Sequence, residues 1–155
     1  MTKQEAFTLM VQHLRTQAAP SFTTGKDGEV HCLYRHPDGI KRCAVGVLLS
    51  DADYRPTLEN KGIGGVLAFY PHLRQLAPLN STTCIYGYFG MLQQMQNLHD
   101  SVLDSQGNIK KDFLNLWEDG FKNIARDHDL IVPEHPCTDK VTVEVAMTQA
   151  EPITV

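Results

Sequence analysis

The sequence has no C-x-x-C pair, no long apolar run and no excess of positive charge. Its four cysteines (Cys32, Cys43, Cys84 and Cys137) are far apart in the chain. This spacing excludes a zinc ribbon and a thioredoxin motif, and it predicts reduced thiols. No segment is apolar for long enough to cross a bilayer, and MTKQEAFTLMVQHLR at the start lacks the apolar stretch of a signal peptide. We therefore expect a cytoplasmic protein that is not associated with a membrane.

The charge balance also limits the classes of partner. Lysine and arginine number 14 against 18 aspartates and glutamates, which gives a formal net charge of -4. Non-specific nucleic-acid binding requires many cations to neutralise phosphates, so broad binding to DNA or RNA is not expected. The glycines at 62–65 (GIGG) lack the GxGxxG spacing of a dinucleotide-binding loop. No cofactor is predicted.

Helical patterns dominate what is present. Thr2 and Glu5 form a capping-box pattern, and the helix that follows is expected to end before Pro20. Apolar residues recur at helical spacing over residues 86–103. Asn108 is the predicted N-cap of a further helix that carries Trp117 toward the core. These last two helices predict an antiparallel helical hairpin.

Other parts of the chain predict a small β element and a tail. The segment at 21–29 (SFTTGKDGE) is rich in turn residues and is expected to be a loop. Pro133 and the alternating VTVEV at 141–145 indicate a strand followed by a tail. We predict an α+β fold that is mostly helical, with the helical hairpin packed on a small antiparallel β-hairpin. Residues 1–132 would form a single globular domain, and residues 133–155 a C-terminal strand and tail.

The stretch CLYRHPDGIKRCAVG at 32–46 is expected to supply that β-hairpin. If residues 36–39 (HPDG) form its loop, simple register pairs Tyr34 with Lys41 and Cys32 with Cys43. The two thiols would then be neighbours. In a reduced compartment such a pair is read either as two small buried hydrophobic residues or as a redox couple.

The same stretch concentrates positive charge. Within twelve residues only Asp38 opposes the cations and histidines, which are His31, Arg35, His36, Lys41 and Arg42. The planar guanidinium of arginine binds phosphate or carboxylate through two donors, and Tyr34 could stack on a base or sugar. The alternative interpretation is a solvated hairpin tip whose charges bind nothing.

A second geometry predicts chemistry at Cys43. If the residues from Cys43 onward open a short helix, the helix dipole would favour the thiolate and make Cys43 a nucleophile. His99 faces inward on the long helix and would be its base, although an inward histidine can also be a core residue. Asp100 should point to solvent, since adjacent helical residues diverge by about 100°, and so should not orient His99. No metal site is predicted, because alternation along the strand would turn His31 away from Cys32.

One more segment supplies candidate ligand contacts. Ser50 is a predicted N-cap, and the short helix after it would carry Tyr54 and Glu59. Tyr54 could stack on a ligand. Glu59 could accept a hydrogen bond from a ligand hydroxyl, or it could remain solvated.

Several of these elements occur together in a recognisable order. The chain has C-x-Y-R (Cys32, Tyr34, Arg35), a D-G turn, C-A-V-G at 43–46, D-x-x-Y (Asp51, Tyr54) with Glu59, and an L-x-x-L-H-D helix that contains His99 and Asp100. In this order it resembles a family of small uncharacterised proteins of bacteriophages and prophages. The resemblance covers most of residues 1–130. It implies a role in the host cytoplasm, where small phage proteins often act on host machinery or counter host immunity.

Three functions follow from these expectations. The favoured one is a non-enzymatic protein that binds a small anionic nucleotide-like ligand and could sequester a host immune signal. The residues expected to contact the ligand are Tyr34, Arg35, Lys41, Arg42, Cys43, Tyr54, Glu59 and His99. The second is a hydrolase of such a ligand, with Cys43 as nucleophile and His99 as base. The third is an inhibitor that binds a host protein, for example by adding the VTVEV strand to a partner's sheet. The first function is compatible with a homo-oligomer.

Overall fold

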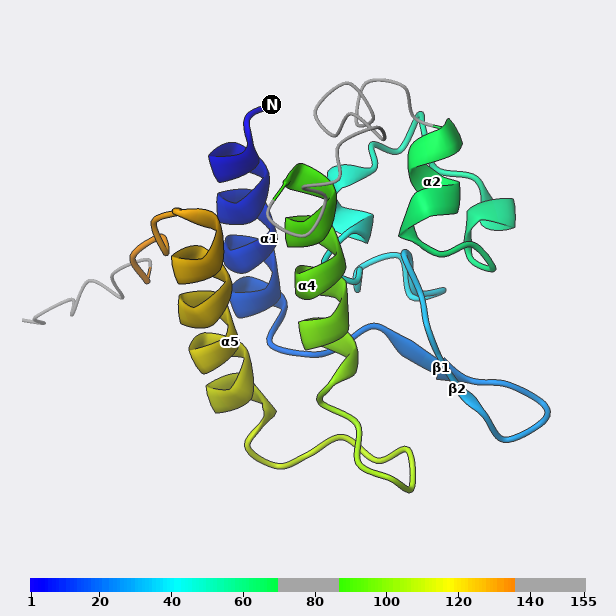
Figure 1. The fold of residues 1–155 in the computed structure, drawn as a ribbon. Coiled ribbons are helices and arrows are strands. Elements are labelled where there is room, and N and C mark those ends of the chain that lie inside the picture. The colour runs from blue at the N-terminus through cyan, green and yellow to red at the C-terminus, as the bar shows by residue number, and fades with distance from the viewer. Residues whose placement is uncertain (70–86, 136–155) are drawn as a thin grey trace, which may run out of the picture.

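A computed structural model describes residues 1–69 and 87–135 and shows an α+β fold that is mostly helical, as predicted (Figure 1). The helices α1, α4 and α5 lie side by side, and the two-stranded sheet and α2 lie on the other side of α4 from α5. The elements in chain order are α1 (Lys3–Gln17), β1 (Phe22–Thr24), β2 (Val30–Cys32), the 3₁₀ helices η1 (Gly46–Leu48) and η2 (Pro56–Leu58), α2 (Ile63–Phe69), α4 (Tyr88–Asp100) and α5 (Phe113–His128).

The predicted cap of α1 is confirmed. The hydroxyl of Thr2 accepts a hydrogen bond from the backbone N–H of Glu5 at 3.1 Å, and the Glu5 carboxylate accepts one from the N–H of Thr2 at 2.6 Å. These two bonds satisfy N–H groups that have no partner inside the helix. The helix ends at Ala18, which adopts the left-handed conformation, before Pro20 as expected.

The predicted helical hairpin is also confirmed: α4 and α5 pack against each other. The second helix begins at Phe113, not close after Asn108. Residues 104–108 instead form a turn in which the Asp104 carboxylate accepts the N–H groups of Gln106 and Asn108. Asn108 therefore belongs to this turn and does not cap α5, which begins five residues later at Phe113.

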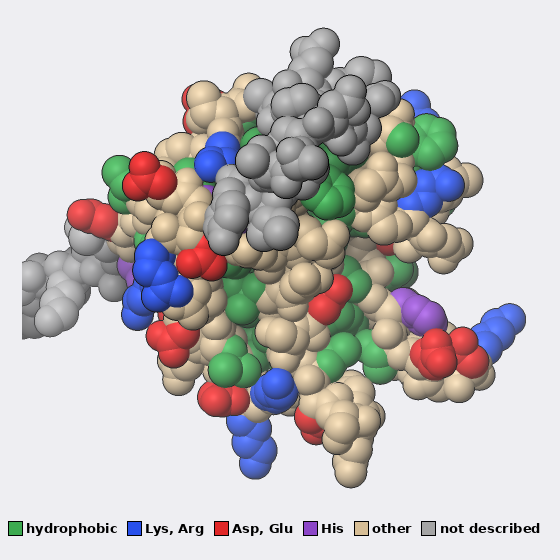
Figure 2. All heavy atoms as spheres, viewed as in Figure 1, with side chains coloured by type: hydrophobic (Ala, Val, Ile, Leu, Met, Phe, Trp, Pro, Cys, Tyr) green, Lys and Arg blue, Asp and Glu red, His purple; other side chains and the backbone are tan. Residues whose placement is uncertain are grey.

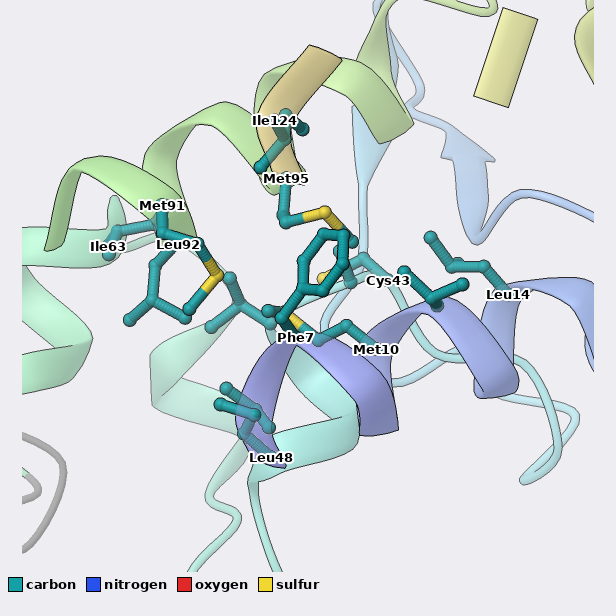
Figure 3. Close-up of a cluster of buried hydrophobic side chains, with 14 of the residues drawn as sticks. Phe7, Met10, Leu14, Cys43, Leu48, Ile63, Met91, Leu92, Met95 and Ile124 are labelled. Atoms are coloured by element: carbon teal, nitrogen blue, oxygen red, sulfur yellow. The ribbon is translucent and has the colours of Figure 1, made fainter. Parts of the chain in front are cut away.

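The core lies where the three long helices meet the segment around η1. Figure 3 shows side chains from α1 and α4 converging with Cys43, Leu48 and Ile124. All of the labelled residues are less than a tenth exposed. Burial of this apolar surface is the main source of stability for such a fold. The labelled members from α1 and α4 are Phe7, Met10, Leu14, Met91, Leu92 and Met95.

The β-hairpin lies earlier in the chain than predicted. Strand β1 pairs with β2 in antiparallel register, with Phe22 opposite Cys32. The prediction that Cys32 pairs with Cys43 is therefore wrong, and part of the segment at 21–29 is a strand and not a loop. The turn at 36–39 does form, closed by a hydrogen bond from the His36 N–H to the Lys41 carbonyl at 2.8 Å, but no strands flank it.

Three earlier expectations lie outside the described residues. These are the strand VTVEV at 141–145, which falls within residues 136–155, and the cysteines Cys84 and Cys137. Among the helices that the structure describes, none has the length and apolar character to span a bilayer.

Candidate functional site

A polar pocket lies between one face of α4 and the segments at 32–34 and 59–63. Its volume is about 250 Å³. The α4 residues that line it are spaced by three or four positions and therefore share a helix face. We call this site the polar pocket; its lining includes Cys32, Tyr34, Glu59, Lys61, Gln93, Gln96, Asn97 and Asp100.

Glu59 is held at this pocket by donors from the chain itself. Its carboxylate accepts the backbone N–H of Tyr34 at 2.8 Å, the N–H of Arg35 at 3.0 Å and the hydroxyl of Tyr54 at 2.7 Å. The Tyr34 hydroxyl donates to the Lys61 carbonyl at 2.6 Å. Burial raises the pKa of Tyr34, and burial with the Glu59 contact raises the pKa of Tyr54 to about 12. Both phenols therefore act as neutral donors.

The predicted cationic patch is largely neutralised. Arg35 and Arg42 both contact the Asp51 carboxylate, at 2.7 and 3.2 Å, and Lys41 contacts Asp38 at 3.3 Å. Hydrogen bonds from the backbone around Lys41 lower the pKa of Asp38, which keeps it charged. Asp38 is the only acidic residue within the twelve-residue window, but the fold also brings Asp51, from outside that window, to the two arginines.

The element around Asp51 differs from the predicted helix. Ser50 caps a turn, with its hydroxyl accepting the N–H of Asp53 at 3.2 Å, and the chain then enters η2. Proline at the first position of η2 favours this short helix, because its φ is fixed and its missing N–H is not needed there. Tyr54 and Glu59 consequently flank a 3₁₀ turn and do not share one α-helix.

The two predicted thiols are neighbours despite the different hairpin. Hydrogen bonding with the Cys43 thiol, followed by burial, raises the pKa of Cys32 above that of an ordinary thiol. Cys32 also accepts a hydrogen bond from the Gln96 side-chain amide at 2.9 Å. Cys43 has no exposed surface, and its sulfur accepts the N–H of Gly46 at 3.4 Å. Neither thiol has the exposed, electropositive surroundings of a reactive cysteine.

His99 is buried as predicted, but it contacts Asp100, which was not predicted. Its Nδ1 lies 2.9 Å from the Asp100 carboxylate, whereas Asp100 was expected to point away into solvent. The prediction rested on the 100° between successive helix positions and ignored how far a carboxylate can reach back. Nε2 of His99 accepts the backbone N–H of Ser21 at 3.0 Å.

These two contacts determine the tautomer of His99. Because Nε2 must be unprotonated to accept from Ser21, the neutral ring carries its proton on Nδ1 and donates it to Asp100. Cys32, His99 and Asp100 place one donor atom each within 4.8 Å of one another, the kind of set that can hold a metal. A metal on Nδ1 would require a proton on Nε2, facing the Ser21 N–H, so the observed bonds oppose metal binding.

The same contacts bear on the prediction that His99 acts as a base for the Cys43 nucleophile. The nitrogen that could act as a base is occupied by the Ser21 N–H, and the Cys32 sulfur lies 3.7 Å from the protonated Nδ1. Cys43 is buried and does not contact His99 in any hydrogen bond among the described residues. The arrangement therefore lacks the nucleophile–base pair of a cysteine hydrolase.

A second, larger cavity of about 410 Å³ lies between α1 and α5. Apolar side chains such as Phe121 and Leu114 form most of its wall, and Arg15 and Glu118 form an ion pair at 2.7 Å beside them. None of the residues predicted to bind a ligand lines this cavity.

Sequence reasoning missed Lys61, Gln96 and Asn97. A signal was present, because Gln93, Gln96, Asn97 and Asp100 follow the i, i+3, i+4, i+7 spacing of one helix face. Of that face, only Asp100 enters the sequence predictions, and its side chain is predicted to point to solvent. The opposite wall of the pocket comes from residues 59–63. Their position cannot be predicted from hydrophobic periodicity, because most of them lie in a loop.

Together, the fold and the pocket define a small α+β protein with a polar pocket of about 250 Å³. No model of a known protein family matches the chain, and no curated protein or solved structure matches it either.

Proposed function

We propose that this protein binds a small nucleotide-like ligand in the polar pocket and releases it unchanged. The observation that carries the proposal is the side chain of Gln96, which is 8 % exposed. Its Oε1 is buried and has no hydrogen-bond partner among the described residues. Its Nε2 donates to Asp100 at 3.0 Å, which fixes the orientation of the amide. A buried acceptor without a donor is costly, and a small shift of this pocket-lining side chain would let a donor group on a ligand satisfy it.

The other lining groups fit the polar parts of a nucleotide. The amides of Gln93 and Asn97 offer both donors and acceptors, as base edges require, and they are linked to each other at 3.0 Å. Lys61 supplies an ammonium group for a phosphate. The two carboxylates at the pocket favour donors such as amino groups or sugar hydroxyls.

The contacts favour binding over turnover. Chemistry at Cys43 would need an accessible thiolate and a free base, and the structure gives a buried thiol and a histidine whose two nitrogens are engaged. Binding needs only shape and hydrogen-bond complementarity.

The biological setting of this proposal rests on the resemblance to phage proteins. In that setting the ligand would be a nucleotide signal of host immunity, held in the host cytoplasm by a sequestering protein. The strand VTVEV, the example given for how an inhibitor would bind a host protein, lies outside the described residues.

The test is native mass spectrometry of the purified protein with a panel of linear and cyclic nucleotides and NAD-derived compounds. We expect a bound mass equal to that of intact ligand. Lys61→Ala and Gln96→Leu should weaken binding on the order of tenfold, because each removes a polar contact in a desolvated site. Lys122→Ala is the matched control, since Lys122 lies on α5 beside Asp119 and away from the pocket.

Two outcomes would overturn the proposal. Conversion of a ligand by the wild-type protein that stops in Cys43→Ala would establish the hydrolase instead. Absence of binding across the panel would leave a protein partner as the better hypothesis.

A further inference from the structure

Two guanidinium groups converge on a single carboxylate outside the polar pocket. Nη2 of Arg35 lies 2.7 Å from Oδ1 of Asp51, and Nη2 of Arg42 lies 3.2 Å from the same oxygen. None of these three residues lines the polar pocket. The pair therefore forms a separate positive site that one carboxylate oxygen occupies.

Arg35 is held in place independently of Asp51. Its guanidinium lies 4.7 Å from the centre of the Tyr54 ring, and Nη2 also donates to the Leu49 carbonyl at 3.0 Å. Its side chain is only 18 % exposed, and its Nε–H has no acceptor among the residues that the structure describes. A guanidinium fixed by stacking and by a carbonyl loses little entropy when an anion binds to it.

Arg42 is anchored through its backbone. Its N–H donates to the Gln17 side chain at 2.7 Å, and its carbonyl accepts from the same side chain at 3.0 Å. The backbone position of the residue is therefore set by α1, and its guanidinium contacts the Asp51 carboxylate without being anchored by Gln17.

Asp51, in contrast, is held weakly. Its side chain is 82 % exposed and lies in the turn after Ser50. Exposed ion pairs contribute little, because water solvates the carboxylate almost as well as the arginines do. A phosphate group carries more charge and more acceptor oxygens than a carboxylate, and it matches the donor geometry of two arginines.

We propose that Arg35 and Arg42 form a binding site for a phosphate group, and that the Asp51 carboxylate occupies this site until a phosphate displaces it. The phosphate could be free or could belong to a nucleotide. The site and its test do not depend on what the polar pocket binds.

The experiment is isothermal titration of the full chain with inorganic pyrophosphate at low ionic strength. Asp51→Asn removes the charge of the competitor and should tighten binding about two- to fivefold, the ratio expected for one exposed ion pair. Arg42→Gln should weaken binding on the order of tenfold, because it removes one charge-assisted contact and keeps the backbone anchor to Gln17. Lys122→Ala, which removes one positive charge elsewhere, should leave the affinity unchanged.

A parallel titration with adenosine monophosphate in Lys61→Ala separates the two sources of phosphate. Retained binding would assign the nucleotide's phosphate to the arginines, and lost binding with pyrophosphate affinity intact would restrict the site to free phosphates. The proposal is overturned if Asp51→Asn binds pyrophosphate no better than the wild type. It is also overturned if Lys122→Ala weakens binding as much as Arg42→Gln, since the attraction would then be diffuse.

Discussion

The ring of His99 is held at both nitrogens and by two neighbouring aromatic rings. Ser21 donates to Nε2, Asp100 accepts from Nδ1, and the ring lies 4.9 Å from Phe22 and 5.9 Å from Trp117 between centroids. The histidine therefore joins the start of β1 to α4 and directs the Asp100 carboxylate. In this interpretation it is a positioning residue for the polar pocket and not a base.

The substitution His99→Phe separates the contribution of the aromatic contacts from that of the hydrogen bonds. Phenylalanine keeps the ring between Phe22 and Trp117 but leaves the buried N–H of Ser21 without an acceptor, which should cost about 2–3 kcal/mol in the free energy of unfolding. Urea denaturation measures this loss. His31→Phe is the control, because His31 is half exposed and its loss should matter little. Equal stabilities of the two variants would contradict the role given to His99.

Cys32 leads to a prediction about reactivity. Its pKa is raised by the Cys43 thiol and by burial, so the thiol stays protonated at about pH 8, where an ordinary cysteine is partly thiolate. Iodoacetamide should therefore modify Cys32 slowly in the folded protein and rapidly in urea. Peptide mapping by mass spectrometry follows this residue separately from the other cysteines. Rapid modification in the folded state would show that Cys32 is an activated thiol.

At the scale of elements, the C-x-Y-R and C-A-V-G segments and Glu59 hold one another in place. Glu59 accepts the backbone N–H groups of Tyr34 and Arg35, the Cys32 and Cys43 thiols interact, and Gly46 packs against the backbone of Tyr34. The C-x-Y-R and C-A-V-G segments are therefore joined without a β-ladder. Of these two segments only C-x-Y-R lines the polar pocket, through Cys32 and Tyr34, and the buried C-A-V-G segment packs behind it.

Gly46→Ala tests this packing. A Cβ at position 46 would overlap the carbonyl oxygen of Tyr34, and backbone cannot move away as a flexible side chain can. We expect a loss of about 2–4 kcal/mol in thermal or chemical denaturation. Gly64→Ala in α2 is the control, because none of the residues described in the structure lies within 4 Å of a Cβ at this position and alanine favours a helix. Equal stability of the two variants would refute the close approach.

The helix pair α1 and α5 is joined by a partly buried ion pair. The Glu118 carboxylate accepts from Nε and Nη2 of Arg15 at 2.7 and 2.8 Å, and this contact is the largest cause that lowers the pKa of Glu118 below 4.5. A carboxylate with a lowered folded pKa adds stability at neutral pH, and that stability is lost as the pH falls through and below 4.5.

Glu118→Gln should therefore cost about 1–2 kcal/mol near neutral pH, a value reduced from that of a fully buried pair because Glu118 is 26 % exposed. The difference from the wild type should shrink as the pH is lowered below 4.5, where the native carboxylate also becomes protonated. Urea denaturation at a series of pH values measures both effects. A difference that is independent of pH would mean that the charge of Glu118 does not stabilise the fold.

These elements also show what the sequence could and could not predict. The cap at Thr2 and the helical periodicity are local signals, and they predicted α1 and the helical hairpin. The pairing of Phe22 with Cys32 and the approach of Asp51 to Arg35 depend on contacts between distant segments. The predicted hairpin over residues 32–43 is wrong because a D-G turn is compatible with a hairpin but does not require strands on either side of it. For the pocket, Tyr34 and Glu59 were identified, whereas Lys61 and Gln96 were not.

At the scale of the molecule, charges of both signs are interspersed on the surface (Figure 2). The sequence carries a net charge of -4, and several cations contact acidic neighbours, including Arg15, Arg35, Lys41 and Arg42. Each such contact lowers the local potential that would attract a polyanion. Two arginines can still bind one phosphate group, but no extended positive face follows from these pairs.

We therefore expect no binding of double-stranded DNA or RNA at near-physiological salt. Affinity from backbone contacts scales with the number of phosphates neutralised, and the displacement of one Asp51 would expose a site for only one. Electrophoretic mobility shift over a range of salt concentrations measures this. Asp51→Asn should bind pyrophosphate more tightly and still fail to shift a duplex, since a single phosphate contact contributes a salt slope of only about -1. A steep salt-dependent shift in the wild-type protein would mean that the paired cations act together as a surface for nucleic acid.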